Sequence, residues 1–268
     1  MQPIKKNIVM ITLLGMAGLW SIKTRAQQDF VVTYAKVNPD LLPNNLKLLI
    51  VEGNLYNAQE VKALKAKCNL VLAYISFTEI SKDDEDYKNF APYTMGENET
   101  WGSCYINLKD NRALNLMKEH ALALLQKGFD GLFLDTMDNV GAWGNLPELK
   151  NEVLHLIHTI DQEAKPNIWV QNGGLDLLPK THQLISTVLV ESVATDYNFK
   201  EKAYRLRKQQ DFNQRKQQLL QAKDEFKIEV LVVEYAIEEE VTQQVHKRLS
   251  GLPFSYFVSN IALNQYKQ

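Results

Sequence analysis

Eight short runs of apolar and β-branched residues recur along the chain, most of them separated by stretches with helical spacing. The runs are Val31–Ala35, Leu48–Val51, Leu70–Ile75, Gly131–Leu134, Ile168–Val170, Thr187–Val190, Ile228–Val233 and Phe254–Val258. Continuous apolar strands that alternate with helices are typical of a parallel sheet covered on both faces. Eight such units in about 240 residues predict a single-domain α/β protein, a (β/α)8 TIM barrel. The rival is an open doubly wound sheet, but no glycine-rich turn follows the first run.

Most of the segments between the runs have apolar residues at helical spacing. The predicted helices are Ala58–Lys67, Asn111–Lys127, Pro147–Ala164, a short one near Leu177, Phe199–Lys223 and Glu238–Leu249. Gly128 and Gly251 follow two of them, as expected where a helix ends. The polar stretch from Thr78 to Ser103 has no clear periodicity, and we predict that it is a long loop.

Carboxylates and amides stand at or just past the end of nearly every apolar run. They are Glu52, Glu79, Asp135, Gln171, Asn172, Glu191, Glu234 and Asn260. Because the carboxyl ends of the strands meet at one mouth of such a barrel, we predict a single acidic pocket there. Any one acid could instead cap a helix or turn, and this alternative stays open for Asp138. Asp130 precedes its strand, so we expect it to be structural, at the opposite end.

Two facing carboxylates in different environments are what glycoside hydrolysis requires. One must hold a proton for the leaving group, and the other must be ionised. Sugar sites also need flat apolar surfaces, and aromatic residues lie at or after several strand ends. They are Tyr34, Tyr74, Trp101, Trp143, Tyr197 and Tyr235. Core packing is the competing interpretation, which we favour for Tyr34 and weakly for Tyr74, whereas Trp101 and Trp143 stand in polar loops.

Other chemistries fit the sequence less well. The five histidines fall in or beside predicted helices, and neither H-E-x-x-H nor G-x-S-x-G occurs. We therefore expect no metal site and no cofactor. The formal net charge of -2 gives no reason to expect a nucleic-acid partner. The basic helix predicted at Phe199–Lys223 is interpreted as a solvated surface.

The first 26 residues have the pattern of a signal peptide. Lys5 and Lys6 precede an apolar run from Ile8 to Trp20, which is too short for a comfortable membrane span, and Thr24-Arg25-Ala26 follows. We predict that residues 1–26 are removed, that 27–268 form the barrel, and that the protein is exported, either periplasmic or secreted. The alternative is a buried N-terminal helix. We expect no integral membrane association, and we expect Cys68 and Cys104 to lie far apart and unpaired.

Five segments at these strand ends resemble a known family, the endo-α-1,4-polygalactosaminidases of glycoside hydrolase family 114, and its TIM-barrel relatives. AYISFTEI at 73–80 resembles the family's A-Y-I-S-x-G-E segment, and GFDGLFLDTMD at 128–138 its G-F-D-G-hydrophobic-x-L-D-x-x-D segment. VQNGG at 170–174, VLVESV at 188–193 and VLVVEYA at 230–236 resemble its Q-N-G segment and its strands ending in Glu and in D-Y. The chain departs from the family at Thr78, which is usually Gly, and at Glu234, which is usually Asp; both changes would resize the pocket.

The resemblance implies a (β/α)8 barrel that cleaves an α-linked, amino-sugar-containing polysaccharide internally, with Asp135 and Glu191 as the working carboxylates. We assign Asp135 as nucleophile or stabilising carboxylate and Glu191 as general acid. The residues expected to bind sugar or tune these two acids are Glu79, Asp138, Gln171, Asn172, Tyr197, Glu234, Trp101, Trp143 and Tyr74. The alternative is a non-catalytic barrel that binds a glycan without cutting it. The stereochemical outcome and the oligomeric state stay open.

Overall fold

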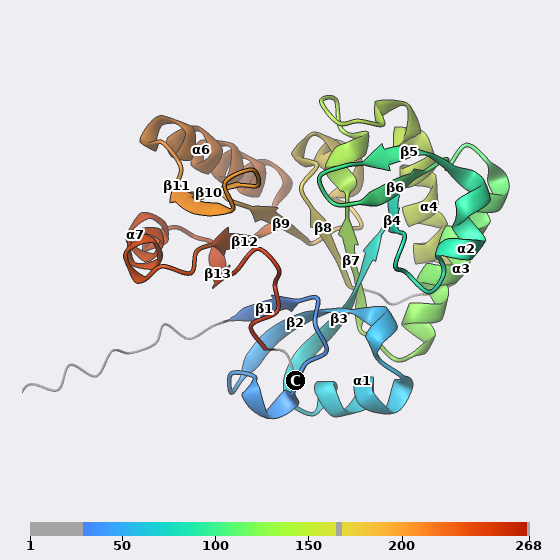
Figure 1. The fold of residues 1–268 in the computed structure, drawn as a ribbon, viewed down its shortest axis with the longest axis horizontal. Helices are drawn as coiled ribbons and strands as arrows, with labels where there is room; N and C mark the ends of the chain where they lie inside the picture. Colours follow the sequence, from blue (N-terminus) through green and yellow to red (C-terminus); the bar gives the residue numbers. More distant parts are fainter. Residues whose placement is uncertain (1–28, 165–167, 267–268) are drawn as a thin grey trace, which may run out of the picture.

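The computed structural model describes residues 29–164 and 168–266, and its core is a sheet of eight parallel strands that curls into a nearly closed barrel (Figure 1). The strands are β1 Phe30–Thr33, β2 Leu46–Glu52, β3 Cys68–Ser76, β7 Gly131–Asp135, β8 Ile168–Asn172, β9 Thr187–Glu191, β12 Glu229–Tyr235 and β13 Ser255–Ser259. They are hydrogen-bonded in that order, each parallel to its neighbour. The predicted (β/α)8 barrel is therefore confirmed, while the predicted signal peptide lies outside the described residues.

Side chains, rather than a backbone ladder, join β13 to β1. The rings of Phe30 and Phe257 meet edge to face at 6.1 Å, and the Ser255 hydroxyl donates to Asp29 at 3.2 Å. After β13 the chain turns back, and the Tyr34 amide donates to the Leu263 carbonyl at 2.9 Å. The barrel is thus closed on this side by packing and by the C-terminal segment.

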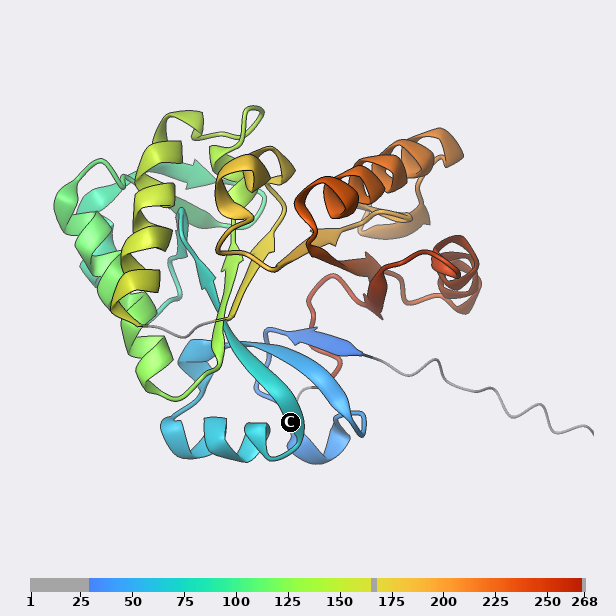
Figure 2. The same cartoon turned by 180° about the vertical axis from the view of Figure 1, so that it is seen from behind.

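Helices cover the outside of the barrel (Figures 1 and 2). They are α1 Ala58–Lys65, α3 Asn111–Gln126, α4 Lys150–Glu163, α5 Leu178–Thr181, α6 Gln209–Phe226 and α7 Glu239–Leu249, with 3-10 turns η1 Pro39–Leu41, η2 Gly53–Leu55, η4 Met137–Val140, η5 Pro147–Leu149 and η6 Leu175–Leu177. α1 begins at a capping box, in which the Asn57 side chain accepts from the backbone of Glu60 and the Glu60 side chain accepts from the backbone of Asn57. α3 begins after Asp110, whose carboxylate accepts from the Arg112 amide. Within the described residues, no helix is long and apolar enough to cross a membrane.

The prediction of a long loop at 78–103 is wrong, because this stretch contains most of a small antiparallel sheet. β4 Glu79–Ser81, β6 Ser103–Ile106 and β5 Thr94–Asn98 pair in that order, with α2 Tyr87–Phe90 and η3 Ala91–Tyr93 between β4 and β5. The strands are short and β5 is largely exposed, so its sequence carries little of the apolar signal by which strands are recognised. This sheet stands beside the carboxyl ends of the barrel strands (Figure 1).

The helix predicted at Phe199–Lys223 is wrong over its first ten residues. β10 Thr195–Asn198 and β11 Ala203–Leu206 form an antiparallel hairpin there, and α6 begins only at Gln209. The Asn198 side chain accepts from the amides of Lys200 and Glu201 at 3.0 Å, and Lys202 takes a left-handed φ of 51°. The left-handed backbone at Lys202 prevents a helix from continuing past this turn.

The core fills the barrel interior and the space beneath the helices. Trp169, Phe30, Phe77, Phe133 and Phe257 are among its largest fully buried side chains. Cys68 and Cys104 are both buried and free, as the sequence suggested.

Candidate active site

Asp135 and Glu191 lie in one hydrogen-bonded group at the carboxyl ends of β7 and β9. The side-chain nitrogen of Asn172, from the intervening strand β8, donates to Asp135 Oδ1 at 2.7 Å and to Glu191 Oε1 at 2.9 Å. The other oxygen of each carboxylate accepts from a tyrosine: Asp135 from Tyr74 at 2.8 Å, and Glu191 from Tyr235 at 2.5 Å. All four carboxylate oxygens are therefore held by the protein.

Strand register explains why these side chains converge. In a strand, successive side chains point to opposite faces, while residues paired across a ladder point to the same face. Tyr74 pairs with Phe133, so Asp135, two residues beyond Phe133, shares the face of Tyr74. Glu191 pairs with Val233, two residues before Tyr235. The pairing thus aims both acids and both tyrosines into the barrel mouth.

Burial and mutual charge act together on the two acids. Burial raises the pKa of Asp135, against the opposing hydrogen bonds from Asn172 and Tyr74. Burial also raises the pKa of Glu191, and the negative charge of Asp135 raises it further. An ionised Asp135 therefore favours a protonated Glu191, as a general acid requires. Burial raises the pKa of Tyr74 and of Tyr235 well above the ordinary value, so both phenols remain donors.

Tyr34 and Tyr74 form the wall beside Asp135. Their rings lie 4.7 Å apart, and Tyr74 also packs at 6.2 Å from Phe133. Both rings are partly exposed and line a cavity of about 200 Å³ with Glu52 and Glu79. Tyr34 and Tyr74 thus pack against each other and are also accessible from this cavity.

Glu79 is buried, and its carboxylate links separate segments of the chain by hydrogen bonds. It accepts from Asn98 at 3.1 Å, from Asn139 at 2.7 Å and from the Ser103 hydroxyl. These bonds join β4, β5 and β6 to the turn that follows β7. Thr136, next to Asp135, has a left-handed φ of 59°, and its hydroxyl is 2.8 Å from that of Thr78.

Gln171 and Glu234 were predicted to bind sugar hydroxyls or to tune the pKa values of the two acids, and the structure buries both completely. Gln171 donates to the carbonyls of Gly173 and Gly174 and accepts from Thr181. Glu234 accepts from the amides of Ala194 and Thr195 at 2.6 and 2.8 Å and from the Thr195 hydroxyl at 2.5 Å. Each precedes a mouth-facing residue in its strand, so strand alternation turns it outward. Both hold loops at the ends of their strands.

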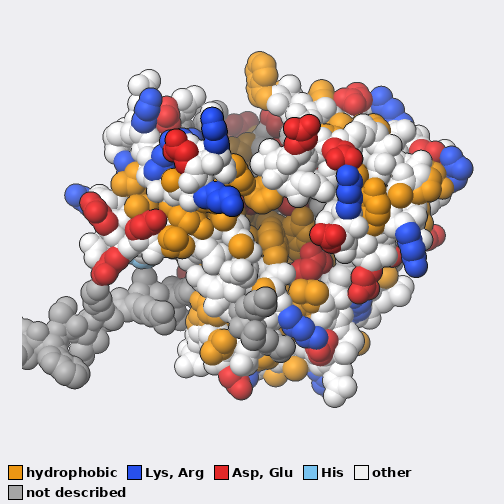
Figure 3. Space-filling model, in the orientation of Figure 1, with side chains coloured by type: hydrophobic (Ala, Val, Ile, Leu, Met, Phe, Trp, Pro, Cys, Tyr) orange, Lys and Arg blue, Asp and Glu red, His pale blue; other side chains and the backbone are white. Residues whose placement is uncertain are grey.

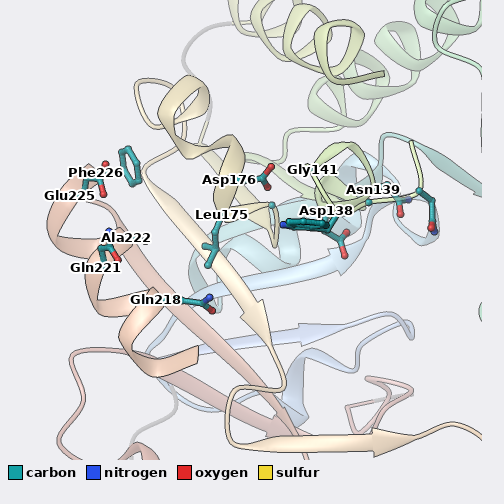
Figure 4. A pocket seen from close by; sticks show the side chains of 14 residues that line it. Asp138, Asn139, Gly141, Leu175, Asp176, Gln218, Gln221, Ala222, Glu225 and Phe226 are labelled. Atoms are coloured by element: carbon teal, nitrogen blue, oxygen red, sulfur yellow. The ribbon is translucent and has the colours of Figure 1, made fainter. Parts of the chain in front are cut away.

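The remaining predicted residues lie around the rim of the mouth. Asp138 and Trp143 border a second, larger cavity beyond β7 and β8 (Figure 4), and Trp143 is 98% exposed. Trp101, between β5 and β6, meets Phe199 of the β10–β11 turn at 5.2 Å, and Phe199 meets Tyr197 at 5.0 Å. Figure 3 shows a hollow between the lobe that carries β4–β6 and the lobe that carries β10 and β11, with acidic side chains near its edge.

Four supporting residues of the site were not singled out from the sequence. Ser103, Thr136, Asn139 and Phe199 act through contacts that only the folded loops create. Tyr235 was considered only for stacking, although it donates to Glu191. Among the described residues, no cluster of three or more His, Cys, Asp or Glu side chains is arranged to hold a metal ion.

Comparisons with known proteins bear on this site. The glycoside hydrolase domain of PelA from Pseudomonas aeruginosa matches with a TM-score of 0.76 and 22% identity, over 88% of this chain and 96% of that one. Aspergillus fumigatus Ega3, solved in complex with galactosamine, matches with a TM-score of 0.68 and 13% identity, over 90% and 93%. An α-galactosidase from Thermus thermophilus matches with a TM-score of 0.57 and 9% identity, over 90% and 59%. At these identities the likeness shows the shared barrel fold.

The search of curated proteins finds no match. The family model described as glycoside-hydrolase family GH114 matches residues 16–268, nearly the whole chain. This match confirms the family that the five strand-end segments suggested. The chain therefore belongs to glycoside-hydrolase family GH114 and is a glycoside hydrolase.

Proposed function

We propose that this glycoside hydrolase is exported and cuts an α-linked, amino-sugar-containing polysaccharide internally, with Asp135 as nucleophile and Glu191 as general acid. The observation that carries the proposal is the Asn172 amide nitrogen, which bonds both carboxylates at once. Such a contact holds two acids close together while their remaining oxygens face the tyrosines on either side. No cofactor takes part in this mechanism.

The spacing of the pair favours a double-displacement mechanism with retention of configuration. The bridged oxygens of Asp135 and Glu191 can be no farther apart than the two bonds from Asn172, 2.7 and 2.9 Å, laid end to end. Retaining glycosidases hold their carboxyl groups about 5–5.5 Å apart, whereas inverting ones need about 6.5–9.5 Å for a water molecule. The close approach of these two oxygens supports the retaining arrangement.

In this mechanism, residues of the site carry out both chemical steps. Glu191 donates its proton to the glycosidic oxygen while Asp135 attacks the anomeric carbon, which gives a covalent glycosyl-enzyme and frees one chain end. Glu191, now ionised, takes a proton from water, and this water displaces Asp135. Tyr74 and Asn172 stabilise the carboxylate that Asp135 becomes again when it leaves.

The choice of an amino sugar rests on the family and on the chemistry of the rim. The family resemblance implies an α-1,4-linked galactosamine polymer, and the structurally similar Ega3 was solved with galactosamine. Exposed Trp101 and Trp143 supply flat surfaces on which sugar rings can stack. An open rim with aromatic residues in separate loops suits a polymer that passes across the mouth.

Export rests on the N-terminal pattern of Lys5, Lys6 and the apolar run up to Trp20. Sequencing the N-terminus of protein from the native host should give Gln27. An intact Met1 on protein recovered from the cytosol would refute export.

Release of reducing ends from a panel of amino-sugar polymers tests the proposed function. Wild type should cut at least one polymer, while Asp135→Asn and Glu191→Gln should not, with thermal unfolding nearly unchanged. If wild type binds a polymer but cuts none, the protein is a glycan-binding barrel instead. If both variants cut as fast as wild type, the assigned pair is wrong.

A further inference from the structure

A second cavity, of about 660 Å³, lies outside the barrel mouth, between the loops that follow β7 and β8 and the helix α6 (Figure 4). One wall begins at Asp138, three residues after Asp135, and at Gly174, two residues after Asn172. The loops that form this wall therefore begin at the strand ends that carry Asp135 and Asn172. Its size is that of a pocket for a small ligand or for a unit of a polymer.

Acidic, amide and aromatic side chains line this cavity. Its acids are Asp138, Asp176 and Glu225, its amides are Asn139, Asn145, Gln218 and Gln221, and its aromatic residues are Trp143 and Phe226. No lysine, arginine or histidine is among the described residues that line it. Three carboxylates without a basic partner favour a cationic ligand. Amides beside an indole ring are suited to hydroxyl groups on a flat-sided ligand, as in a sugar.

The face of α6 toward the cavity is polar where a packed helix would be apolar. Gln218, Gln221, Ala222, Glu225 and Phe226 are spaced by three and four residues, so they share one face, and Figure 4 shows them on one helix opposite Leu175 and Asp138. Gln218, Gln221 and Glu225 are exposed. α6 packs on the barrel through Phe212, Leu219 and Ala222, of which Ala222 also borders the cavity. This polar face is thus free to meet a ligand.

The loop that carries Trp143 is built firmly. The Ala142 amide donates to Asp176 at 2.8 Å, and the Leu146 amide donates to the Asn139 carbonyl at 2.8 Å. Gly144 lies so close to this turn that an added Cβ would be 2.1 Å from the Asn139 carbonyl oxygen. These contacts fix the backbone of the loop from which the 98%-exposed Trp143 projects.

We infer that this cavity is an auxiliary subsite that binds an amino-sugar unit carrying a free, protonated amine, on the same polymer that occupies the catalytic mouth. This inference rests on the proposed function for the identity of the polymer. Glu225 attracts the ammonium group, Gln218 and Gln221 bond the hydroxyls, and Trp143 packs on the ring face. An N-acetylated unit has no charge and gains nothing from the carboxylates.

Binding of α-1,4-linked galactosamine polymer tests the subsite, measured by affinity electrophoresis in an Asp135→Asn host that leaves the polymer uncut. Adding Glu225→Gln should weaken binding of the de-N-acetylated polymer about fivefold. Binding of the same polymer after N-acetylation should change less than twofold. The loss of affinity for the de-N-acetylated polymer should vanish at high salt, since the attraction is electrostatic.

The matched control is Glu240→Gln, an exposed acid in the first turn of α7, which should leave binding unchanged. Equal affinity of the host with and without Glu225→Gln would overturn the inference, as would equal weakening by Glu240→Gln. The outcome is independent of catalysis. If wild type fails to cut the polymer while the α6 variant still loses binding, the proposed function fails and the subsite stands.

Discussion

Replacement of Glu52 by Gln should stabilise the protein at high pH and leave it unchanged at low pH. Glu52 ends β2, and its carboxylate accepts from the Asn54 amide at 3.2 Å, a bond that Gln can also accept. Burial raises the pKa of Glu52 from 4.5 to about 7; nearby Asp84 adds to the rise, while the Asn54 amide and Lys127 oppose it. The folded protein therefore holds this proton more tightly than the unfolded chain does.

The sign and the size of the change in stability follow from this shift in the pKa of Glu52. Because the folded-state pKa is raised, stability is lost as the pH rises from about 4.5 through about 7, and the loss is complete above that range. Each unit of pKa corresponds to about 1.4 kcal/mol, so the loss in wild type is about 3 kcal/mol at most. Gln has no proton to lose. For a domain of this size, Glu52→Gln should unfold roughly 5–10 °C higher at pH 8 and at the same temperature near pH 4.5.

Thermal unfolding followed by circular dichroism at the two pH values measures this difference. Glu60→Gln is the control, because a hydrogen bond from Lys36 lowers the pKa of Glu60, so this variant should gain nothing at pH 8. An equal gain for Glu52→Gln at both pH values would show that packing, and not titration, is responsible. No gain at pH 8 would refute the burial argument for Glu52.

Three further predictions concern the catalytic group and its support. Asn172→Ala removes the shared donor and should lower kcat about 10²–10³-fold with little change in unfolding temperature; a wild-type rate of reducing-end release would contradict the bridging role. Glu234→Ala leaves the amides of Ala194 and Thr195 without their buried acceptor and should cost about 3 kcal/mol in urea unfolding, so a loss below about 1 kcal/mol would refute this. Tyr235→Phe removes a hydrogen bond that lowers the pKa of Glu191, so the basic limb of the kcat/KM profile should move to higher pH; an unmoved limb would count against Glu191 as the acid.

The barrel strands could be predicted because their apolar runs are continuous and their helices periodic. Each predicted run overlaps the observed strand, and Asp135 and Glu191 end β7 and β9 as expected. The β4–β6 sheet could not be predicted in the same way. β5 is mostly exposed, and β4 is held in place by the buried Glu79, whose partners Asn98, Ser103 and Asn139 come from three separate segments. Such contacts across loops leave no periodic trace in the sequence.

The orientation of strand-end residues was available in the sequence but was not used. Gln171 and Asn172 are neighbours in one strand, as are Glu234 and Tyr235, so only one of each pair can face the mouth. Since Asn172 and Tyr235 face it, Gln171 and Glu234 must face away. Which member of a pair turns inward still depends on register across the ladder, and that register comes from the packed barrel.

The most direct test of the catalytic pair is to trap the covalent intermediate. A fluorinated galactosamine donor with a good leaving group should label the protein once, and peptide mass spectrometry should place the label on Asp135 within the GFDGLFLDTMD segment. The Asp135→Asn variant should take up no label. A label on Glu191, or turnover of the donor with inversion and without any labelled peptide, would contradict Asp135 as nucleophile.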